Sequence, residues 1–221
     1  QNDFLSSEPN NEGVLNSNKP YKVLARKYRP QNFDDLMGQE VMVQTLKNAF
    51  KIDRIAHAYM LTGVRGIGKT TTARLLARAL NYKTESINAP NIEMLEIGDH
   101  CNEIMESRHI DVIEMDAASR TGIADIREII DSINYSPSSA RYKIYIIDEI
   151  HMLSKAAFNG LLKTLEEPPS HVKFIFATTE VQKVPLTILS RCQRFDLRRF
   201  DNELVKSLLL KVCAKEDVTI D

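Results

Sequence analysis

Short apolar runs alternate with segments of helical spacing along most of this chain. Five apolar runs have the length and composition of buried strands: residues 59–61, 111–115, 143–147, 172–177 and 194–197. Five other segments predict helices: residues 41–50, 71–80, 122–133, 154–167 and 201–215. This alternation predicts an α/β fold, with a parallel, doubly wound, five-stranded sheet that carries helices on both faces.

Single residues predict the ends of one of these helices and the buried side of another. Ser154 is a suitable N-cap for the helix that begins there, and Pro168 and Pro169 end it. In the helix over residues 41–50, we expect four apolar residues on one side: Val41, Leu46, Ala49 and Phe50.

The chain divides into three unequal parts. Residues 1–20 consist mainly of Asn, Ser, Glu, Asp and Pro, which predicts a flexible arm. Residues 21–200 hold the alternating strands and helices and form one domain. Residues 201–221 begin a further helical unit, so we expect this chain to be a fragment of a longer protein.

A phosphate-binding loop follows the first predicted strand. The pattern G-x-x-x-x-G-K-[ST] is matched by Gly63, Val64, Arg65, Gly66, Ile67, Gly68, Lys69 and Thr70, with Thr71 next to it. Glycines let backbone N–H groups approach phosphate oxygens, Lys69 can reach the β- and γ-phosphates, and Thr70 can ligate Mg²⁺. The helix that follows directs the positive end of its dipole at the phosphates. A nucleotide and a magnesium ion are therefore expected.

Two adjacent carboxylates end the third apolar run. In a parallel sheet, ligands gather at the carboxyl ends of the strands. Asp148 can hold Mg²⁺ there, and Glu149 can orient or deprotonate an attacking water. Acidic residues that simply end a strand are the alternative, and the phosphate loop upstream argues against it. A nucleotide kinase needs no such glutamate, so Glu149 favours hydrolysis.

Two further polar features are ambiguous from the residues alone. Thr178 and Thr179 end the fourth run, where they either contact the γ-phosphate or simply end a strand. Arg191 either stabilises transition-state charge, in its own site or in a neighbour's, or is a solvated surface residue.

Composition narrows the class of protein only slightly. The net charge of −1 gives no overall attraction to nucleic acid or to acidic membranes, although a local basic face remains compatible with it. Cys101, Cys192 and Cys213 are far apart, which fits a reducing cytoplasm rather than a disulfide scaffold. No apolar stretch approaches the roughly 18 residues of a membrane span. We therefore expect a cytoplasmic protein without a membrane partner.

Seven motifs, in order, resemble those of clamp-loader ATPases of the AAA+ class. They are V-L-A-R-K-Y-R-P at 23–30, G-Q-E at 38–40, D-A-A-S-R at 116–120, D-E-I-H at 148–151, L-L-K-T-L-E-E-P-P at 161–169, A-T-T at 177–179 and S-R-C at 190–192. Within that class the chain is similar to the gamma/tau subunits of bacterial DNA polymerase III. The resemblance runs from about residue 21 to the end of the chain.

The resemblance implies roles for residues that the pattern alone left open. Residues 63–70 become the Walker A loop, and Asp148 and Glu149 end the Walker B strand, with Glu149 as the catalytic base. Thr179, rather than Thr178, becomes the sensor of the γ-phosphate, and Arg191 becomes a finger that enters the neighbouring subunit's ATP site. The adenine and ribose fall near Ala25, Arg29 and Pro30.

The resemblance also implies an activity and partners. The family is an ATPase within the DNA polymerase III holoenzyme, a DNA-directed DNA polymerase and nucleotidyltransferase complex. It forms a heteropentameric ring with delta and delta-prime subunits and other copies of itself. With ATP bound, the ring opens the sliding clamp and sets it on primed DNA during replication.

One segment departs from the family. A four-cysteine zinc module usually stands where residues 82–110 lie, but this chain keeps only Cys101 and has Tyr82 at the first cysteine's place. His100 and His109 add two nitrogen ligands at an unfamiliar spacing, and a structural zinc site needs four ligands. We expect a degenerate insert without zinc, more mobile than a metal-bound one.

Two other functions remain open from the sequence. One is a non-hydrolysing ring scaffold, but such subunits tend to lose the phosphate loop that is intact here. The other is a different AAA+ DNA-remodelling ATPase, such as a Holliday-junction or helicase-loading motor, and the segments at 161–169 and 190–192 argue against it.

Overall fold

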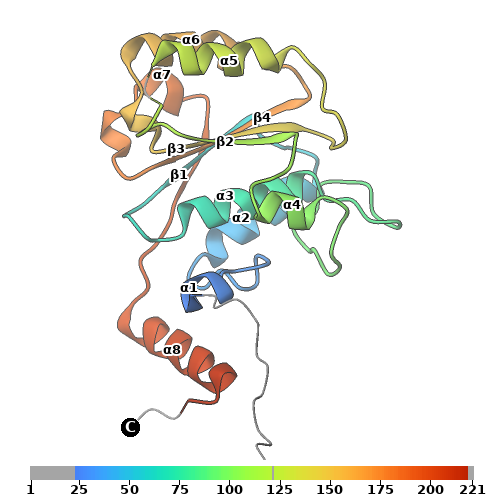
Figure 1. Ribbon diagram of the computed structural model, residues 1–221, viewed down its shortest axis with the longest axis vertical. Coiled ribbons are helices and arrows are strands. Elements are labelled where there is room, and N and C mark those ends of the chain that lie inside the picture. The colour runs from blue at the N-terminus through green and yellow to red at the C-terminus, as the bar shows by residue number, and fades with distance from the viewer. Residues whose placement is uncertain (1–22, 121, 219–221) are drawn as a thin grey trace, which may run out of the picture.

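One parallel sheet organises the molecule. The computed structural model describes residues 23–120 and 122–218, without the side chains of Ala25 and Arg26. The strands are β1 (Ala58–Thr62), β2 (Val112–Asp116), β3 (Lys143–Asp148), β4 (Val172–Thr178) and β5 (Gln193–Asp196). They pair in the order β2-β3-β4-β1-β5, all parallel (Figure 1). The predicted fold class is confirmed, while the predicted arm over residues 1–20 lies outside the described residues.

Helices cover both faces of the sheet. Helices α2 (Glu40–Lys51), α3 (Lys69–Leu80) and α4 (Cys101–Met105) lie on one face, and α5 (Ile123–Ile133), α6 (Lys155–Glu166) and α7 (Leu186–Leu189) lie on the other (Figure 1). Because successive strand residues point to opposite faces, Tyr59 and Leu61 pack in the first core and Ala58 and Met60 in the second. Two apolar layers therefore hold the strand ends in place.

Helix α2 buries a different stripe from the predicted one. Val41 is 69% exposed, whereas Met42 and Leu46 are buried in the core below the sheet. Met42 and Leu46 stand four residues apart and so share one side of the helix, and Val41 points about 100° away from Met42. Leu46 and Phe50 pack against the same core as predicted, Ala49 is half-buried, and the prediction was wrong for Val41.

The insert over residues 82–110 packs against the core. Tyr82 is 1% exposed and Cys101 3% exposed, and both belong to the core on the α3 side. His109 Nε2 lies 2.9 Å from His100 Nδ1. Within the described residues, no three His, Cys, Asp or Glu side chains gather as a metal site would require. Apolar burial holds the insert here, and the absence of zinc stays a prediction.

The chain ends in a helix that stands away from the sheet. Helix α8 (Asn202–Glu216) begins at Asp201, whose side chain accepts a hydrogen bond from the Leu204 N–H at 2.8 Å. It lies beside the short helix α1 (Leu24–Lys27), and Glu216 accepts hydrogen bonds from Lys27 and Tyr28 (Figure 1). In the described part of the chain, no helix combines the length and apolar character that a bilayer crossing requires.

Candidate nucleotide site

The phosphate loop joins β1 to α3 and leaves open space above its glycines. Gly66 and Gly68 have φ angles of +81° and +97°, which L side chains rarely adopt. A Cβ at either position would meet no atom within 4 Å. Gly63 differs, because a Cβ there would lie 3.1 Å from Ile67 and 3.3 Å from the Leu197 carbonyl oxygen. Gly66 and Gly68 therefore border an open cradle, whereas Gly63 permits close packing.

Lys69 lies in the loop rather than in solvent. It is only 5% exposed, and its Nζ donates to the carbonyl oxygens of Gly63 at 3.0 Å and Val64 at 3.1 Å. Beside it is a cavity of about 300 Å³, lined by the loop and by Arg29, Asp148 and Glu149. The lysine is thus held at the edge of the space where a phosphate chain would lie.

The loop and the acidic strand end meet directly. The Thr70 hydroxyl donates to Asp148 Oδ2 at 2.6 Å, although the two residues are 78 positions apart. The other carboxylate oxygen of Asp148 accepts the Glu149 N–H at 2.9 Å. A hydroxyl oxygen next to a carboxylate oxygen is the donor set that Mg²⁺ takes beside phosphates, so the residues present fit this ion.

Glu149 occupies an unusual backbone conformation at the end of β3. Its φ of +47° and ψ of +43° lie in the left-handed region, which is uncommon for residues other than glycine. Its Oε2 accepts the Thr179 hydroxyl at 2.9 Å and the Thr179 N–H at 3.2 Å. Thr178 is turned elsewhere, with its hydroxyl 2.9 Å from His151 Nδ1. The structure therefore brings Thr179, and not Thr178, to the carboxylate.

A wider groove opens next to these carboxylates. It has a volume of about 670 Å³ and is lined by Val64, Arg65, Asp116, Ala118, Asp148, Glu149, His151, Met152 and Thr179. His151 was not among the residues predicted for the site. Its place two residues after Glu149, in D-E-I-H, was the sequence feature that could have identified it. Sequence alone, however, does not tell where its ring points.

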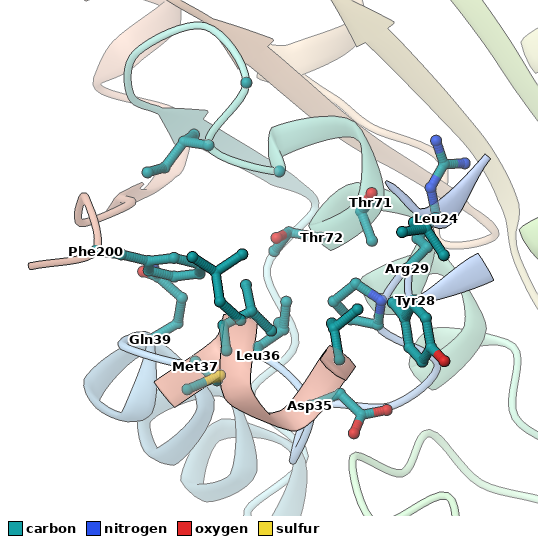
Figure 2. A pocket seen from close by; sticks show the side chains of 17 residues that line it. Leu24, Tyr28, Arg29, Asp35, Leu36, Met37, Gln39, Thr71, Thr72 and Phe200 are labelled. Atoms are coloured by element: carbon teal, nitrogen blue, oxygen red, sulfur yellow. The ribbon is translucent and has the colours of Figure 1, made fainter. Parts of the chain in front are cut away.

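A third cavity, of about 490 Å³, adjoins the loop on its apolar side. Figure 2 shows Tyr28 and Arg29 on one side of it and Gln39 and Phe200 on the other. Pro30, Gly66, Ile67, Gly68 and Thr71 also line it. Arg29, Pro30 and Thr71, which were predicted to contact the nucleotide, line this cavity, and that contact stays a prediction; for Ala25 the structure gives only its backbone place in α1.

Helix α8 closes this cavity in a way that the sequence did not indicate. Leu208, Leu209 and Val212 line it from the side opposite the loop. The cavity is mostly apolar, includes Gly66, Ile67 and Gly68 of the loop in its lining, and has a volume in the usual range of small-molecule sites. The chain therefore offers an apolar chamber for a base next to a polar cradle for phosphates.

Arg191 lies apart from the other candidate residues. Its guanidinium donates to Glu166 Oε1 at 2.7 Å and to the Thr187 carbonyl oxygen at 2.7 Å. None of the cavities beside the loop is lined by it. Within the described residues it therefore joins none of these cavities, and its action on a neighbouring subunit stays a prediction.

Comparison with known proteins agrees with these features. The family described as "DNA polymerase III, delta subunit" matches residues 38–201. The tau subunit of DNA polymerase III from Escherichia coli K12 is 50% identical over 198 residues, which cover 90% of this chain and 30% of the relative. The gamma subunit from Buchnera aphidicola (subsp. Acyrthosiphon pisum) is 49% identical over 201 residues, which cover 91% of this chain and 55% of the relative. The chain thus spans about a third to a half of these relatives.

Solved structures share the fold. The RuvB Holliday junction branch migration motor of Thermotoga maritima superposes with a TM-score of 0.61 at 21% identity, covering 88% of this chain and 56% of that one. A DNA polymerase III gamma subunit-related protein from the same organism gives a TM-score of 0.50 at 24% identity, covering 76% and 49%. At these identities the likeness bears on the fold alone, and it agrees with the predicted parallel α/β architecture.

This chain is identical to a tau subunit at half of the aligned residues, which confirms the predicted resemblance to gamma/tau subunits. Because the family match covers well over half of its length, the chain belongs to the DNA polymerase III delta-subunit family.

Proposed function

We propose that this chain is the ATP-binding and ATP-hydrolysing part of a DNA polymerase III clamp-loader subunit. In that role it works in a heteropentameric ring with delta and delta-prime subunits and further copies of itself. The ring uses ATP to place a sliding clamp on primed DNA. The names of the tau and gamma relatives support this assignment, and the site supplies the chemistry.

One contact carries the proposal: the 2.6 Å hydrogen bond from the Thr70 hydroxyl to Asp148. It joins the end of the phosphate loop to the strand that carries the two acids. A phosphate loop alone only binds, whereas a loop that meets an Asp-Glu pair can also hydrolyse. Thr70 and Asp148 would hold Mg²⁺, which when bound neutralises charge on the phosphate oxygens.

The other residues have separate tasks in this proposal. Lys69 places its positive charge beside the loop carbonyl groups, within reach of the phosphates. Glu149 accepts a proton from the attacking water, and Thr179 orients that carboxylate. Tyr28, Arg29 and Pro30 form the base chamber together with α8. Arg191 stabilises transition-state charge in the adjacent subunit.

Neither alternative function has an observation in its favour. A non-hydrolysing scaffold needs neither Lys69 buried in the loop nor Glu149 held beside Asp148. The likeness to RuvB reflects the fold, since only 21% of residues are identical.

Replacing the base tests hydrolysis separately from binding. In the complex assembled with partner subunits and primed DNA, Glu149→Gln should lower the ATPase kcat by at least about 100-fold and keep binding of a fluorescent ATP analogue within about twofold. Glu128→Gln, on the exposed side of α5, is the matched control and should hydrolyse ATP like the unchanged complex. Normal turnover by the Glu149→Gln complex would show that the chain is not the hydrolysing subunit.

A further inference from the structure

His151 is a nearly buried titratable side chain for which the proposed mechanism has no role. Its side chain is 6% exposed and belongs to the 3₁₀ turn η1 (Ile150–Met152), directly after the two acids. The turn packs against β4, so the imidazole lies between the ends of β3 and β4. A buried polar ring at this place needs partners, and it has them on both nitrogens.

Both ring nitrogens face oxygen atoms of the site. Nδ1 lies 2.9 Å from the Thr178 hydroxyl and 3.4 Å from Glu149 Oε2. Nε2 lies 3.4 Å from Glu180 Oε1. Thr178 is itself fixed, because it is fully buried and its hydroxyl oxygen accepts the Glu180 N–H at 3.1 Å. The ring is thus held between the catalytic strand and the segment that follows β4.

Glu180 links the His151 ring to a residue farther from the site. Its Oε2 pairs with Lys183 Nζ at 2.8 Å on the 3₁₀ turn η2 (Val181–Lys183). The imidazole therefore has Glu180 on the outer side and Glu149 on the inner side.

The contacts on Glu149 are unevenly divided between its two oxygens. Oε2 accepts both hydrogen bonds from Thr179 and lies next to His151 Nδ1. Among the described residues, no hydrogen bond or ion pair reaches Oε1, and the side chain lines the open groove. One oxygen is therefore fixed, and the other is available to a water molecule.

We propose that His151 is a positioning residue for Glu149. His151, which Thr178 holds in place, and Thr179 together fix Oε2, so that Oε1 faces the water that attacks the γ-phosphate. This inference rests on the proposed function, since Glu149 needs such an orientation only in a hydrolysing subunit. A small displacement of a catalytic group lowers a rate strongly while leaving binding intact. We therefore expect loss of His151 to lower kcat rather than to raise KM.

Three substitutions at His151 separate the two ring nitrogens. His151→Leu keeps apolar bulk and removes both nitrogens, and should lower kcat by about tenfold to hundredfold with the KM for ATP changed less than about twofold. His151→Asn places an amide near the position of Nδ1 and should recover most of this loss. His151→Gln places its amide near the position of Nε2 and should stay impaired. ATPase kinetics of the complex with partner subunits and primed DNA give each value.

A second histidine provides the matched control. His171 lies at the other end of β4, where its Nε2 lies 3.0 Å from the Ile133 carbonyl oxygen. His171→Leu removes a half-buried imidazole just before β4, without contact to the site, so it should leave kcat and KM unchanged.

The Glu149→Gln background separates failure of this inference from failure of the proposed function. Where the base is already absent, His151→Leu should cause no further loss of turnover. If Glu149→Gln stops turnover and His151→Leu does not change it, the positioning role is wrong and the ATPase assignment stands. A rise in KM alone, or Gln restoring more activity than Asn, would also overturn it. Should the Leu variant fail to fold, the order of the Asn and Gln variants still decides.

Discussion

Asp111 shows how one residue can fix a turn without taking part in the site. It stands just before β2, is 1% exposed, and its carboxylate accepts N–H groups of Ser138, Ser139 and Ala140 at 2.7 to 2.9 Å. Burial alone would raise the pKa of this carboxyl, but these donors and the Ser139 hydroxyl outweigh burial and hold the pKa below its usual value. The charged form is therefore the one that stabilises the fold.

Replacing Asp111 with Asn should reveal this stabilisation and its pH dependence. An amide NH₂ would face N–H donors, so we expect a loss of about 1–3 kcal/mol of unfolding free energy at pH 7. Because the folded pKa is depressed, the stabilisation is full above the unfolded pKa of about 3.9 and is lost as pH falls through the folded value. Urea unfolding of both proteins at pH 7 and near pH 3 should show the gap narrowing. A gap independent of pH would contradict this account.

Residue identities in the site were predictable, whereas their contacts were not. The fixed spacing of the phosphate loop identifies Lys69 and Thr70, because backbone geometry imposes that spacing. The link from Glu149 to Thr179 depends on β4 lying next to β3, which no local pattern specifies. The place of His151 between two carboxylates depends on the same strand order.

At the scale of elements, the insert over residues 82–110 is held by apolar packing. The buried phenol of Tyr82 donates to the Glu96 carbonyl oxygen at 3.0 Å. Gly98 permits this packing, because a Cβ there would lie 2.7 Å from the Lys83 carbonyl oxygen. Cys101 and Ile104 of α4 complete the contact with α3.

We therefore expect the insert to fold without metal. Purified protein should contain far less than one zinc per chain by elemental analysis, and EDTA should leave its thermal midpoint unchanged, since no metal contributes folding energy. An equimolar zinc content, or a midpoint that falls on chelation, would show that His100, Cys101 and His109 recruit a further ligand.

The helices and strands themselves were largely predictable from apolar periodicity. Each predicted strand matches an observed one, with ends that differ by at most one residue. Helix α8 was predicted in place, but its contact with the base chamber was not. Its apolar residues do not gather into one stripe, and no described residue of the helix is buried. A pattern without a dominant face says little about what a helix packs on.

At the scale of the whole molecule, Arg191 lies away from the candidate site of its own chain. Arg191 follows α7 and pairs with Glu166 at the end of α6, on the face of the sheet opposite α3 (Figure 1). An exposed ion pair of this kind is weak and exchanges readily for another partner. If Arg191 acts in trans as proposed, it would exchange Glu166 for the triphosphate of a neighbouring subunit.

Mixing two inactive variants tests this arrangement. Lys69→Ala should disable its own site, and Arg191→Ala the site of the adjacent subunit. A ring that holds both variants should regain part of the ATPase activity, because one site then keeps its lysine and receives an intact arginine. Arg127→Ala, on the exposed side of α5, is the control and should leave activity unchanged. If both variants assemble and no mixture regains activity, Arg191 does not act across the interface.

The parallel sheet also gives the molecule an edge where probes can be attached. All strands end at the site, so the turns before β2, β3 and β4 lie at the opposite edge. Tyr135, at the start of the turn leading to β3, is 70% exposed there. A fluorophore on a cysteine at this position would report on partner binding from the edge of the sheet opposite the candidate site.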